Sequence, residues 1–442
     1  MEISLPSKVA YIIDTLERNG YEAYAVGGCV RDSVLGLKPA DWDITTSAKP
    51  EEVKVCFRRT VDTGIQHGTV TVMLEKEGFE VTTYRIDGVY SDGRHPDKVT
   101  FTPDLAEDLK RRDFTINAMA YSRRTGVIDY FNGIKDLKEH TVRCVGNPSE
   151  RFDEDALRIM RAVRFAARFG FRIEDGTYRA IAAHAEDLKK ISAERIRDEL
   201  MKTICSPNPM YFREFWQLGI TKVILPEFDI CMETPQHNPH HKYNVGEHIL
   251  HTMDACDPSL RLVMLLHDIG KPEVRRTDPQ GMDHFRGHGL KSAEMADGIL
   301  RRLRFDNETR KRTVHLIRFH DLRPKGEEAD VRRAAAVIGR SCFCDYLSIQ
   351  KADNAAKSNY LREEKLKRLR DVEILYKRIL ERGDCLTVGE LAINGDDLLA
   401  AGIRGKEIGE KLNRALQIVL EDPAKNVREM LMGMLLPAND ED

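Results

Sequence analysis

The stretch that decides the fold of the N-terminal region is GGCVRD (27–32), followed nine residues later by DWD (41–43). YEAYAV (21–26) precedes it and predicts a short strand, so the glycine pair is expected to turn the chain from a strand into a helix. Such a turn directs backbone N–H groups toward one point, where a polyphosphate can bind. Gly28 and Arg31 are therefore candidate phosphate contacts, because an arginine adds a bidentate donor.

Two carboxylates follow this turn. Asp41 and Asp43 are two residues apart on an expected strand (41–45), so we expect both to point to one face. Two hard carboxylates beside a triphosphate suit Mg²⁺, and a pair of such ions can activate a hydroxyl and stabilise a pyrophosphate leaving group. Glu80, on the expected strand 79–85, is either the third carboxylate of this site or a solvated strand residue.

The pattern changes near residue 146. Before it we expect a helix over 7–19 and two strand pairs, 68–75 with 79–85 and 118–124 with 127–131, whereas 86–101 is rich in turn residues. These elements predict an α/β domain with a mixed sheet over residues 1 to about 140. From 151 onward the periodicity is almost entirely helical, so an all-α remainder is expected.

Composition excludes several classes of protein. The 442 residues carry 69 Lys+Arg and 72 Asp+Glu, a net charge of -3, and 41% hydrophobic residues, which excludes a mostly disordered chain and a globally basic one. No apolar run approaches about 20 residues, so no membrane span is expected. Nine cysteines without a framework spacing indicate reduced thiols, and a charged N-terminus argues against a signal peptide, so we expect a cytoplasmic protein.

Three motifs together resemble those of class II tRNA nucleotidyltransferases, the CCA-adding enzymes and their bacterial poly(A) polymerase relatives. The motifs are GGCVRD with DWD, RRDFTINAMAY (111–121) and RFDEDALRIMRAVRFAARFGF (151–171). The resemblance implies a nucleotidyltransferase palm, a helical neck, a body and a tail, with Mg²⁺ on Asp41 and Asp43. It also implies that Arg112, Asp113 and Asn117 belong to the nucleotide pocket. The segment Asp92–Gly93–Arg94 resembles the family's flexible loop, or is a simple surface turn.

The third motif also has a reading from its chemistry. Asp155 and Arg158 are three apart, so we expect them on one helical face beside each other. An acidic acceptor beside a basic donor fits the Watson–Crick edges of cytosine and adenine, whereas uracil and guanine leave buried polar groups unpaired, at about 1–3 kcal/mol each. The alternative is an exposed helical ion pair.

Arginines recur along the same helix, and no acid lies between 156 and 173, so we expect a phosphate-facing surface rather than a solvated face. The arginines are Arg158, Arg161, Arg164, Arg168 and Arg172. Two later segments, 301–323 and 358–370, are locally basic, and we expect them to form part of an RNA backbone track.

A second group of residues resembles the signature of HD metal-dependent phosphohydrolases over about 230–355. Its members are His248, His267, Asp268 and Asp353. Imidazoles with carboxylates suit Ni²⁺, Mn²⁺, Co²⁺ or Fe²⁺. His288 and His320 could widen the site and Lys271 could bind phosphate; the alternative is an HD fold that retains these residues without turnover.

The resemblance implies four parts: a nucleotidyltransferase head (1–140), a neck with the nucleotide-selecting motif (141–225), an HD-type domain (226–356) and a helical, tRNA-binding tail (357–442). We expect an enzyme that adds C, C and A to the 3′ end of tRNA from CTP and ATP. A poly(A) polymerase or an A-adding enzyme is the nearest alternative. An HD phosphohydrolase with a nucleotide-sensing head and a non-enzymatic RNA-binding scaffold are the alternatives of other classes.

Overall fold

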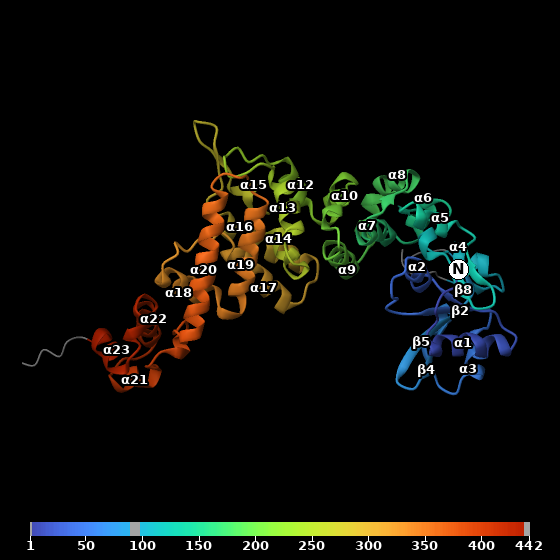
Figure 1. Cartoon of the computed structure of the whole chain (residues 1–442), viewed down its shortest axis with the longest axis horizontal. Coiled ribbons are helices and arrows are strands. Elements are labelled where there is room, and N and C mark those ends of the chain that lie inside the picture. Colours follow the sequence, from blue (N-terminus) through green and yellow to red (C-terminus); the bar gives the residue numbers. More distant parts are fainter. Residues whose placement is uncertain (1, 89–97, 437–442) are drawn as a thin grey trace, which may run out of the picture. The chain divides into compact units, whose positions relative to one another are not determined.

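The computed structural model describes residues 2–88 and 98–436, and the chain divides into two compact units, Met1–Pro226 and Glu227–Asp442 (Figure 1). Each unit is considered by itself. The expected loop at Asp92–Gly93–Arg94 lies outside the described residues.

The first unit begins with a seven-stranded sheet in the order β3-β4-β5-β2-β1-β8-β9. Only the β2–β5 pair of this sheet is parallel, so the predicted mixed sheet is confirmed. The strands are β1 Ala23–Val26, β2 Asp43–Thr46, β3 Thr60–Gly64, β4 Thr69–Leu74, β5 Glu77–Thr83, β8 Ala120–Ser122 and β9 Gly126–Ile128. The β4–β5 turn falls at Glu75–Lys76, earlier than expected. A separate pair, β6 Arg85–Asp87 with β7 Val99–Phe101, flanks the turn-rich segment.

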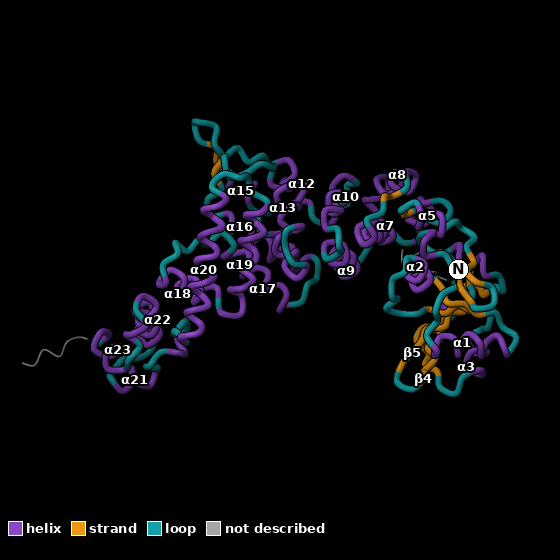
Figure 2. Tube along the Cα trace, in the orientation of Figure 1, coloured by secondary structure: helices purple, strands orange, loops and turns teal. Residues whose placement is uncertain are grey.

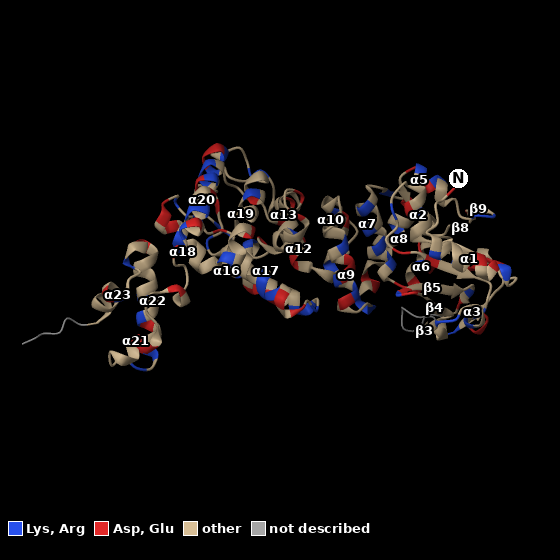
Figure 3. Cartoon of the chain, turned by 60° about the horizontal axis from the view of Figure 1, so that its bottom comes forward, with Lys and Arg blue, Asp and Glu red and all other residues tan. Residues whose placement is uncertain are grey.

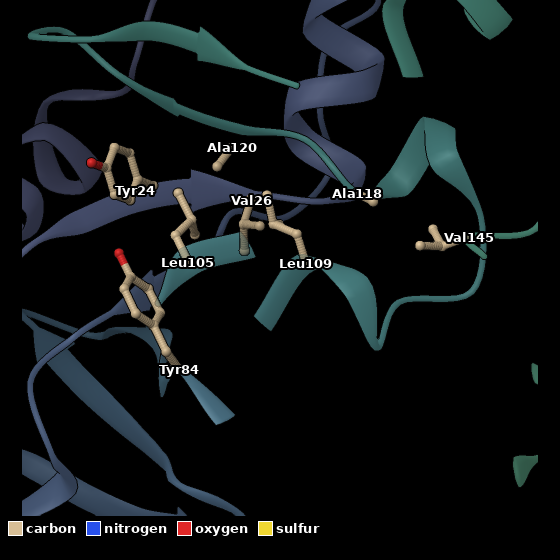
Figure 4. Packing of buried hydrophobic residues seen from close by; sticks show 8 residues of the cluster. All are labelled: Tyr24, Val26, Tyr84, Leu105, Leu109, Ala118, Ala120 and Val145. Carbon is tan, nitrogen blue, oxygen red and sulfur yellow. The ribbon is translucent and has the colours of Figure 1, made fainter. Parts of the chain in front are cut away.

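Helices cover this sheet because each has one apolar face. α1 (Ser7–Arg18) buries Val9, Ile12, Ile13 and Leu16, which recur at helical spacing. The other helices of the head are α2 Gly28–Val34, α3 Pro50–Cys56 and α4 Leu105–Lys110. Figure 4 shows one core cluster, in which Tyr24 and Val26 of β1 pack with Leu105 and Leu109 of α4. The packing against α4 therefore holds β1, the strand that leads into the glycine turn, in place.

The rest of the first unit is helical. Its helices are α5 Gly133–Lys138, α6 Pro148–Glu154, α7 Leu157–Phe169, α8 Asp175–His184, α9 Ala193–Ile204, α10 Phe212–Gln217 and α11 Thr221–Ile224; α12 (Pro226–Glu233) crosses into the second unit. One short parallel pair was not predicted, β10 Thr141–Val142 with β11 Arg172–Ile173. It ties the start of the neck to the residues that follow α7.

The second unit is almost entirely helical, as predicted (Figure 2). Its body comprises α13 Val245–Asp254, α14 Arg261–Leu266, α15 Lys271–Val274, α16 His288–Arg302, α17 Asn307–Phe319, α18 Glu328–Ile338, α19 Arg340–Ala355 and α20 Arg362–Arg382. The hairpin β12 Arg276–Thr277 with β13 Asp283–His284 interrupts the helices and was not predicted. α21 Gly395–Ala400, α22 Lys406–Glu421 and α23 Arg428–Leu435 pack around their own apolar cluster. Among the described residues no helix is long and apolar enough to cross a membrane.

Candidate active site and metal centre

The acidic residues of the head meet where β2 and β5 lie side by side. The parallel register Ile44↔Val81 places Asp43 and Glu80 at neighbouring positions, one residue earlier on each strand. Asp41 lies in the loop before β2, so the expectation that it shares the strand with Asp43 is wrong. The three side chains nevertheless line one cavity, together with Lys8. The structure thus brings together all three carboxylates named from the sequence.

The cluster of Asp41, Asp43 and Glu80 carries an excess of negative charge, which favours the binding of a cation. Desolvation raises the pKa of Asp43 and the neighbouring carboxylates Asp41 and Glu80 raise it further, whereas Arg112 lowers it. Carboxylate oxygens are the ligands that hard divalent cations prefer, and a cation would relieve the repulsion among them. The donor set therefore fits a divalent metal ion.

The backbone conformation and the close packing at position 27 explain why a glycine is needed in this turn. Gly27 has φ +81°, a conformation that favours glycine, and its N–H donates to the carbonyl of Met119 at 3.1 Å. A Cβ atom at this position would lie 2.7 Å from Nη1 of Arg112. The guanidinium of Arg112 therefore packs directly over the turn, and α2 starts at Gly28. The Nε of Arg112 is buried and has no hydrogen-bond partner among the described residues.

The side chain of Arg31 is more deeply buried than we expect of an arginine that is free to bind a phosphate. Its side chain is 3% exposed, donates from Nε to Asp32 at 2.8 Å and also donates to Asn117. The guanidinium lies over the rings of Phe165 and Phe169, 5.1 and 5.0 Å from their centroids. In this structure Arg31 connects α2 to α7, and its contact with a nucleotide stays a prediction.

Asp113 and Asn117 belong to the same buried network. Asp113 accepts from Nε and Nη2 of Arg161 at 2.8 and 2.5 Å and from Nδ2 of Asn117 at 3.0 Å. Burial alone would raise the pKa of Asp113, but the charge of Arg161 and the hydrogen bond from Asn117 hold it well below its usual range. These residues join the head to the neck beside the glycine turn.

The expectation that Asp155 and Arg158 share one helical face is wrong. The helix breaks at Asp155, which is extended (φ −149°) between α6 and α7 and accepts from the N–H of Leu157 at 3.0 Å. Its other oxygen accepts from Arg195 at 2.6 Å, while Arg158 pairs with Glu154 at 2.5 Å. A short polar side chain that caps the next helix could have indicated this break from the sequence.

The arginines of α7 have acidic partners, contrary to the expectation from the local sequence. The partners come from other elements: Arg158 pairs with Glu154, Arg161 with Asp113, Arg164 with Glu199 and Arg168 with Asp32. Burial lowers the pKa of Arg164 to about 10. The stripe therefore ties the neck to the head in this structure. The basic segment 301–323 is similar, since five of its arginines form ion pairs, and Figure 3 shows both signs of charge along α17.

In the second unit the predicted histidine and aspartate residues converge from helices α13, α16 and α19 and from the C-terminal ends of α14 and α17. Nε2 of His248 lies 3.0 Å from Asp353 and 3.4 Å from Asp268, and Nε2 of His267 lies 3.2 Å from Asp268. His288 and His320 approach the other oxygen of Asp268 at 3.4 and 3.6 Å. The buried residues thus form two overlapping groups of possible metal ligands, His248 with His267 and Asp353, and His267 with Asp268 and His320.

The imidazoles are oriented as metal ligands. Nδ1 of His267, His288 and His320 each lies 2.7–2.8 Å from the carbonyl three residues earlier, so each Nδ1 donates to that carbonyl and each Nε2 is left as the nitrogen that could bind a metal. Burial lowers the pKa of both His248 and His288 to about 4, which keeps these two rings neutral. Nε2 of His267 is buried and has no hydrogen-bond partner in the described part of the chain. The set fits a metal that accepts both nitrogen and oxygen ligands.

Basic side chains also line the cavity that contains these histidine and aspartate residues. Lys271, which was predicted, lies 2.7 Å from Asp268. Arg286, Arg323 and Lys357 also line the cavity, and the sequence analysis missed them. Lys357 follows Asp353 by four residues on a helix, a spacing that could have identified it, whereas Arg286 depends on the unpredicted hairpin.

Three models of known protein families match successive parts of the chain. Residues 23–143 match the model of the poly A polymerase head domain, 170–232 match a probable RNA- and SrmB-binding site of polymerase A, and 243–378 match the HD domain. Nucleotidyltransferase and HD domains generally use divalent metals.

Relatives show the same likeness. The chain is 54% identical over 213 residues to the CCA-adding enzyme of Levilactobacillus brevis, covering 48% of this chain and 52% of that protein. It is 55% identical over 199 residues to that of Lactiplantibacillus plantarum, covering 45% and 49%. The chain thus spans about half the length of the curated relatives it matches.

Solved structures resemble the whole chain. The Bacillus stearothermophilus CCA-adding enzyme in complex with CTP is 28% identical, with a TM-score of 0.70 over 98% of both chains. The Thermotoga maritima CCA-adding enzyme complexed with tRNA shares the fold, with a TM-score of 0.60 at 22% identity over 98% of this chain and 100% of that one. The chain therefore contains a poly A polymerase head domain, followed in the sequence by an HD domain, and over its whole length it is similar to the solved structure of a CCA-adding enzyme.

Proposed function

We propose that the head adds C, C and A to the 3′ end of tRNA, using CTP and ATP. The observation that carries this proposal is the cluster of Asp41, Asp43 and Glu80 beside the Gly27–Gly28 turn, with Arg112 packed over that turn. A terminal 3′-hydroxyl of the tRNA attacks the α-phosphate in line, and pyrophosphate leaves. The relatives named above, which are CCA-adding enzymes, support this choice over a poly(A) polymerase or an A-adding enzyme.

Each group in the head has a role in this reaction. Bound Mg²⁺ would supply charge neutralisation and activation of the attacking hydroxyl. Asp41 and Asp43 hold the ion, and Glu80 adds the third negative group. The N–H groups at Gly28 and the guanidinium of Arg112 bind the triphosphate, so the reaction depends mainly on positioning and on stabilised charge.

Nucleotide selection is proposed for Asp155 and Arg158 of the neck. An acceptor and a donor together fit the pairing edges of both C and A. Both side chains are engaged in this structure, Asp155 by Arg195 and Arg158 by Glu154, so a bound base must exchange these contacts for its own. Asp113 and Asn117 support this pocket from the head side, and Arg161 and Arg164 hold α7 in place.

For the HD domain we propose a metal-dependent phosphohydrolase activity toward 2′,3′-cyclic or 3′-phosphate ends. The two overlapping groups of possible metal ligands and the surrounding basic residues support it. Mixed nitrogen and oxygen ligands favour Ni²⁺, Mn²⁺ or Co²⁺ over Mg²⁺. We further propose that residues 357–442 bind tRNA. All nine cysteines are free thiols, which supports a cytoplasmic location.

The test of the head is a tRNA that lacks its last three nucleotides, incubated with each nucleoside triphosphate and Mg²⁺. CTP alone should extend it by two residues, and CTP with ATP by three. A ladder of many A residues would instead identify a poly(A) polymerase, and addition of a single A only to tRNA that already ends in CC would identify an A-adding enzyme.

A further inference from the structure

The hairpin beside α15 is fixed by one buried carboxylate; Figure 2 shows its two short strands. Asp283, 2% exposed, accepts from Nε of Arg275 at 2.9 Å, from the hydroxyl of Thr277 at 2.7 Å and from the N–H of His237 at 2.9 Å. Arg275 directly precedes β12, Thr277 belongs to β12, and His237 lies in a segment that is distant in sequence. The residues that follow Asp283 are therefore held in a fixed position.

His284 and Arg286, which follow Asp283, border two hollows at once. One hollow is the cavity that contains Asp268, His288, His320 and Asp353. The other has a volume of about 490 Å³, within the range of small-molecule sites, and is lined by Glu273, Val274, Arg276, His284 and Arg286. A ligand that binds at the metal ligands can therefore extend past His284 and Arg286 into the second hollow.

The second hollow is cationic. The side chains of Arg276 and Arg286 are exposed, and neither side chain forms an ion pair or a hydrogen bond within residues 2–88 and 98–436. The neighbouring charges are already paired, because Arg275 binds Asp283 and Glu273 binds Lys291 at 2.9 Å. Two unpaired guanidinium groups on one wall are suited to a phosphate, which they can bind with bidentate hydrogen bonds.

We propose that the second hollow binds a second phosphate of the HD substrate, so that the site prefers a nucleotide phosphorylated at both its 3′ and its 5′ oxygen. Such a unit is either a nucleoside 3′,5′-bisphosphate or the 3′-phosphorylated end of an RNA chain. The scissile 3′-phosphate lies at the metal ligands and the 5′-phosphate lies against Arg276 and Arg286. This inference rests on the proposed phosphohydrolase activity.

The reaction consumes one water molecule. The bond between phosphorus and the ribose 3′ oxygen breaks, a bond forms between phosphorus and the water oxygen, and a proton of the water passes to the ribose oxygen.

The test compares the binding of uridine 3′,5′-bisphosphate with that of uridine 3′-monophosphate by calorimetry, on the full chain, both without metal and with Mn²⁺. Uridine is chosen because the head is proposed to reject it. Wild type should bind the bisphosphate about tenfold more tightly. Arg276→Gln should remove most of this advantage and change affinity for the monophosphate less than twofold, and R276Q/R286Q should remove all of it. Arg123→Gln, an exposed arginine of the first unit, is the matched control and should keep the advantage.

The outcomes separate the two proposals. Equal affinity of wild type for both probes, or a full advantage retained by R276Q/R286Q, overturns the second-phosphate site. Binding that depends on Arg276 together with no hydrolysis of the bisphosphate or of p-nitrophenyl phosphate under Mn²⁺, Ni²⁺ or Co²⁺ overturns the phosphohydrolase activity but keeps the binding site. Circular dichroism melting of each variant confirms that the folded protein is compared.

Discussion

Asp113 accepts two hydrogen bonds from Arg161, from Nε at 2.8 Å and from Nη2 at 2.5 Å, and this pair joins the head to helix α7. Asp113 lies one residue after Arg112, which packs over the glycine turn. The pair therefore links the position of the phosphate turn to the helix that follows the nucleotide-selecting Asp155.

Asp113→Asn should destabilise the first unit. It leaves Arg161 without a charged partner, and breaking a buried ion pair from one side costs about 3–5 kcal/mol. Trp42 and Trp216 are the two tryptophans of the chain and both lie in this unit, so their fluorescence during urea unfolding measures the effect. Asp62→Asn, an exposed pair with Lys54, is the control and should change stability by less than about 1 kcal/mol.

The same pair predicts a pH dependence. The pKa of Asp113 is held well below its usual range in the folded state, so the unfolded state binds the proton more readily. The stabilisation is complete above the unfolded pKa of about 3.9 and is lost as the pH falls below it. The difference in unfolding free energy between wild type and Asp113→Asn should therefore be constant from pH 7 to about pH 5 and shrink at lower pH. A difference that grows on acidification contradicts this assignment.

Asp155→Ala should relax nucleotide selection. Removing the acceptor removes a penalty of about 1–3 kcal/mol against UTP and GTP, which is about 5–150-fold in discrimination. Single-nucleotide incorporation with each triphosphate measures it, and Asp153→Asn, at an exposed position two residues earlier, is the control. If preference is unchanged while tRNA affinity collapses, Asp155 is structural.

His267→Ala should separate the two sites. The variant loses a ligand that both candidate metal groups share, so bound Mn²⁺ or Ni²⁺ and any hydrolysis of 2′,3′-cyclic or 3′-phosphate ends should fall to background. Nucleotide addition should remain within about twofold of wild type. Elemental analysis and circular dichroism accompany both assays, with His251→Ala as the control. Loss of nucleotide addition in a folded His267→Ala protein would show that the sites are coupled.

Arg332→Met should loosen the tail. Arg332 is 4% exposed and donates to the carbonyls of Leu420 and Glu421 at 2.7 and 2.9 Å, which fixes the end of α22 on α18. Arg332 also donates to the buried carboxylate of Asp384, so the two carbonyls and this carboxylate lose their donor and stability should fall by about 2–4 kcal/mol. Limited proteolysis should then cut near residues 385–436 faster, and an unchanged digestion rate would exclude this role.

Local motifs were sufficient to predict the mixed sheet and most of the acidic and histidine residues that the structure brings together in the two cavities. Strand and turn signals surround Gly27 and Gly28, and the HD ligands lie in short, distinctive segments. Glu80 was only a candidate because its position beside Asp43 depends on the parallel register of β2 and β5, which no local pattern specifies.

The errors have a common physical origin. The arginines of α7 looked unpaired because their partners, such as Asp32 and Glu199, are far away in sequence. The break at Asp155 was missed because helical periodicity continues across it. The hairpin before Arg286 was missed because its stability comes from the hydrogen bonds that Asp283 accepts from Arg275, Thr277 and the distant His237, and not from strand propensity.

The most direct measurement is the rate of C and A incorporation into tRNA lacking its last three nucleotides by Asp41→Ala, Asp43→Ala and wild type, with Mg²⁺ and with Asp62→Asn as the control. Both active-site variants should fold as wild type does, because both carboxylates lie at the surface of the cavity, and incorporation should fall by several orders of magnitude. Near-normal addition by either variant would contradict the assignment of the head as a metal-dependent nucleotidyltransferase.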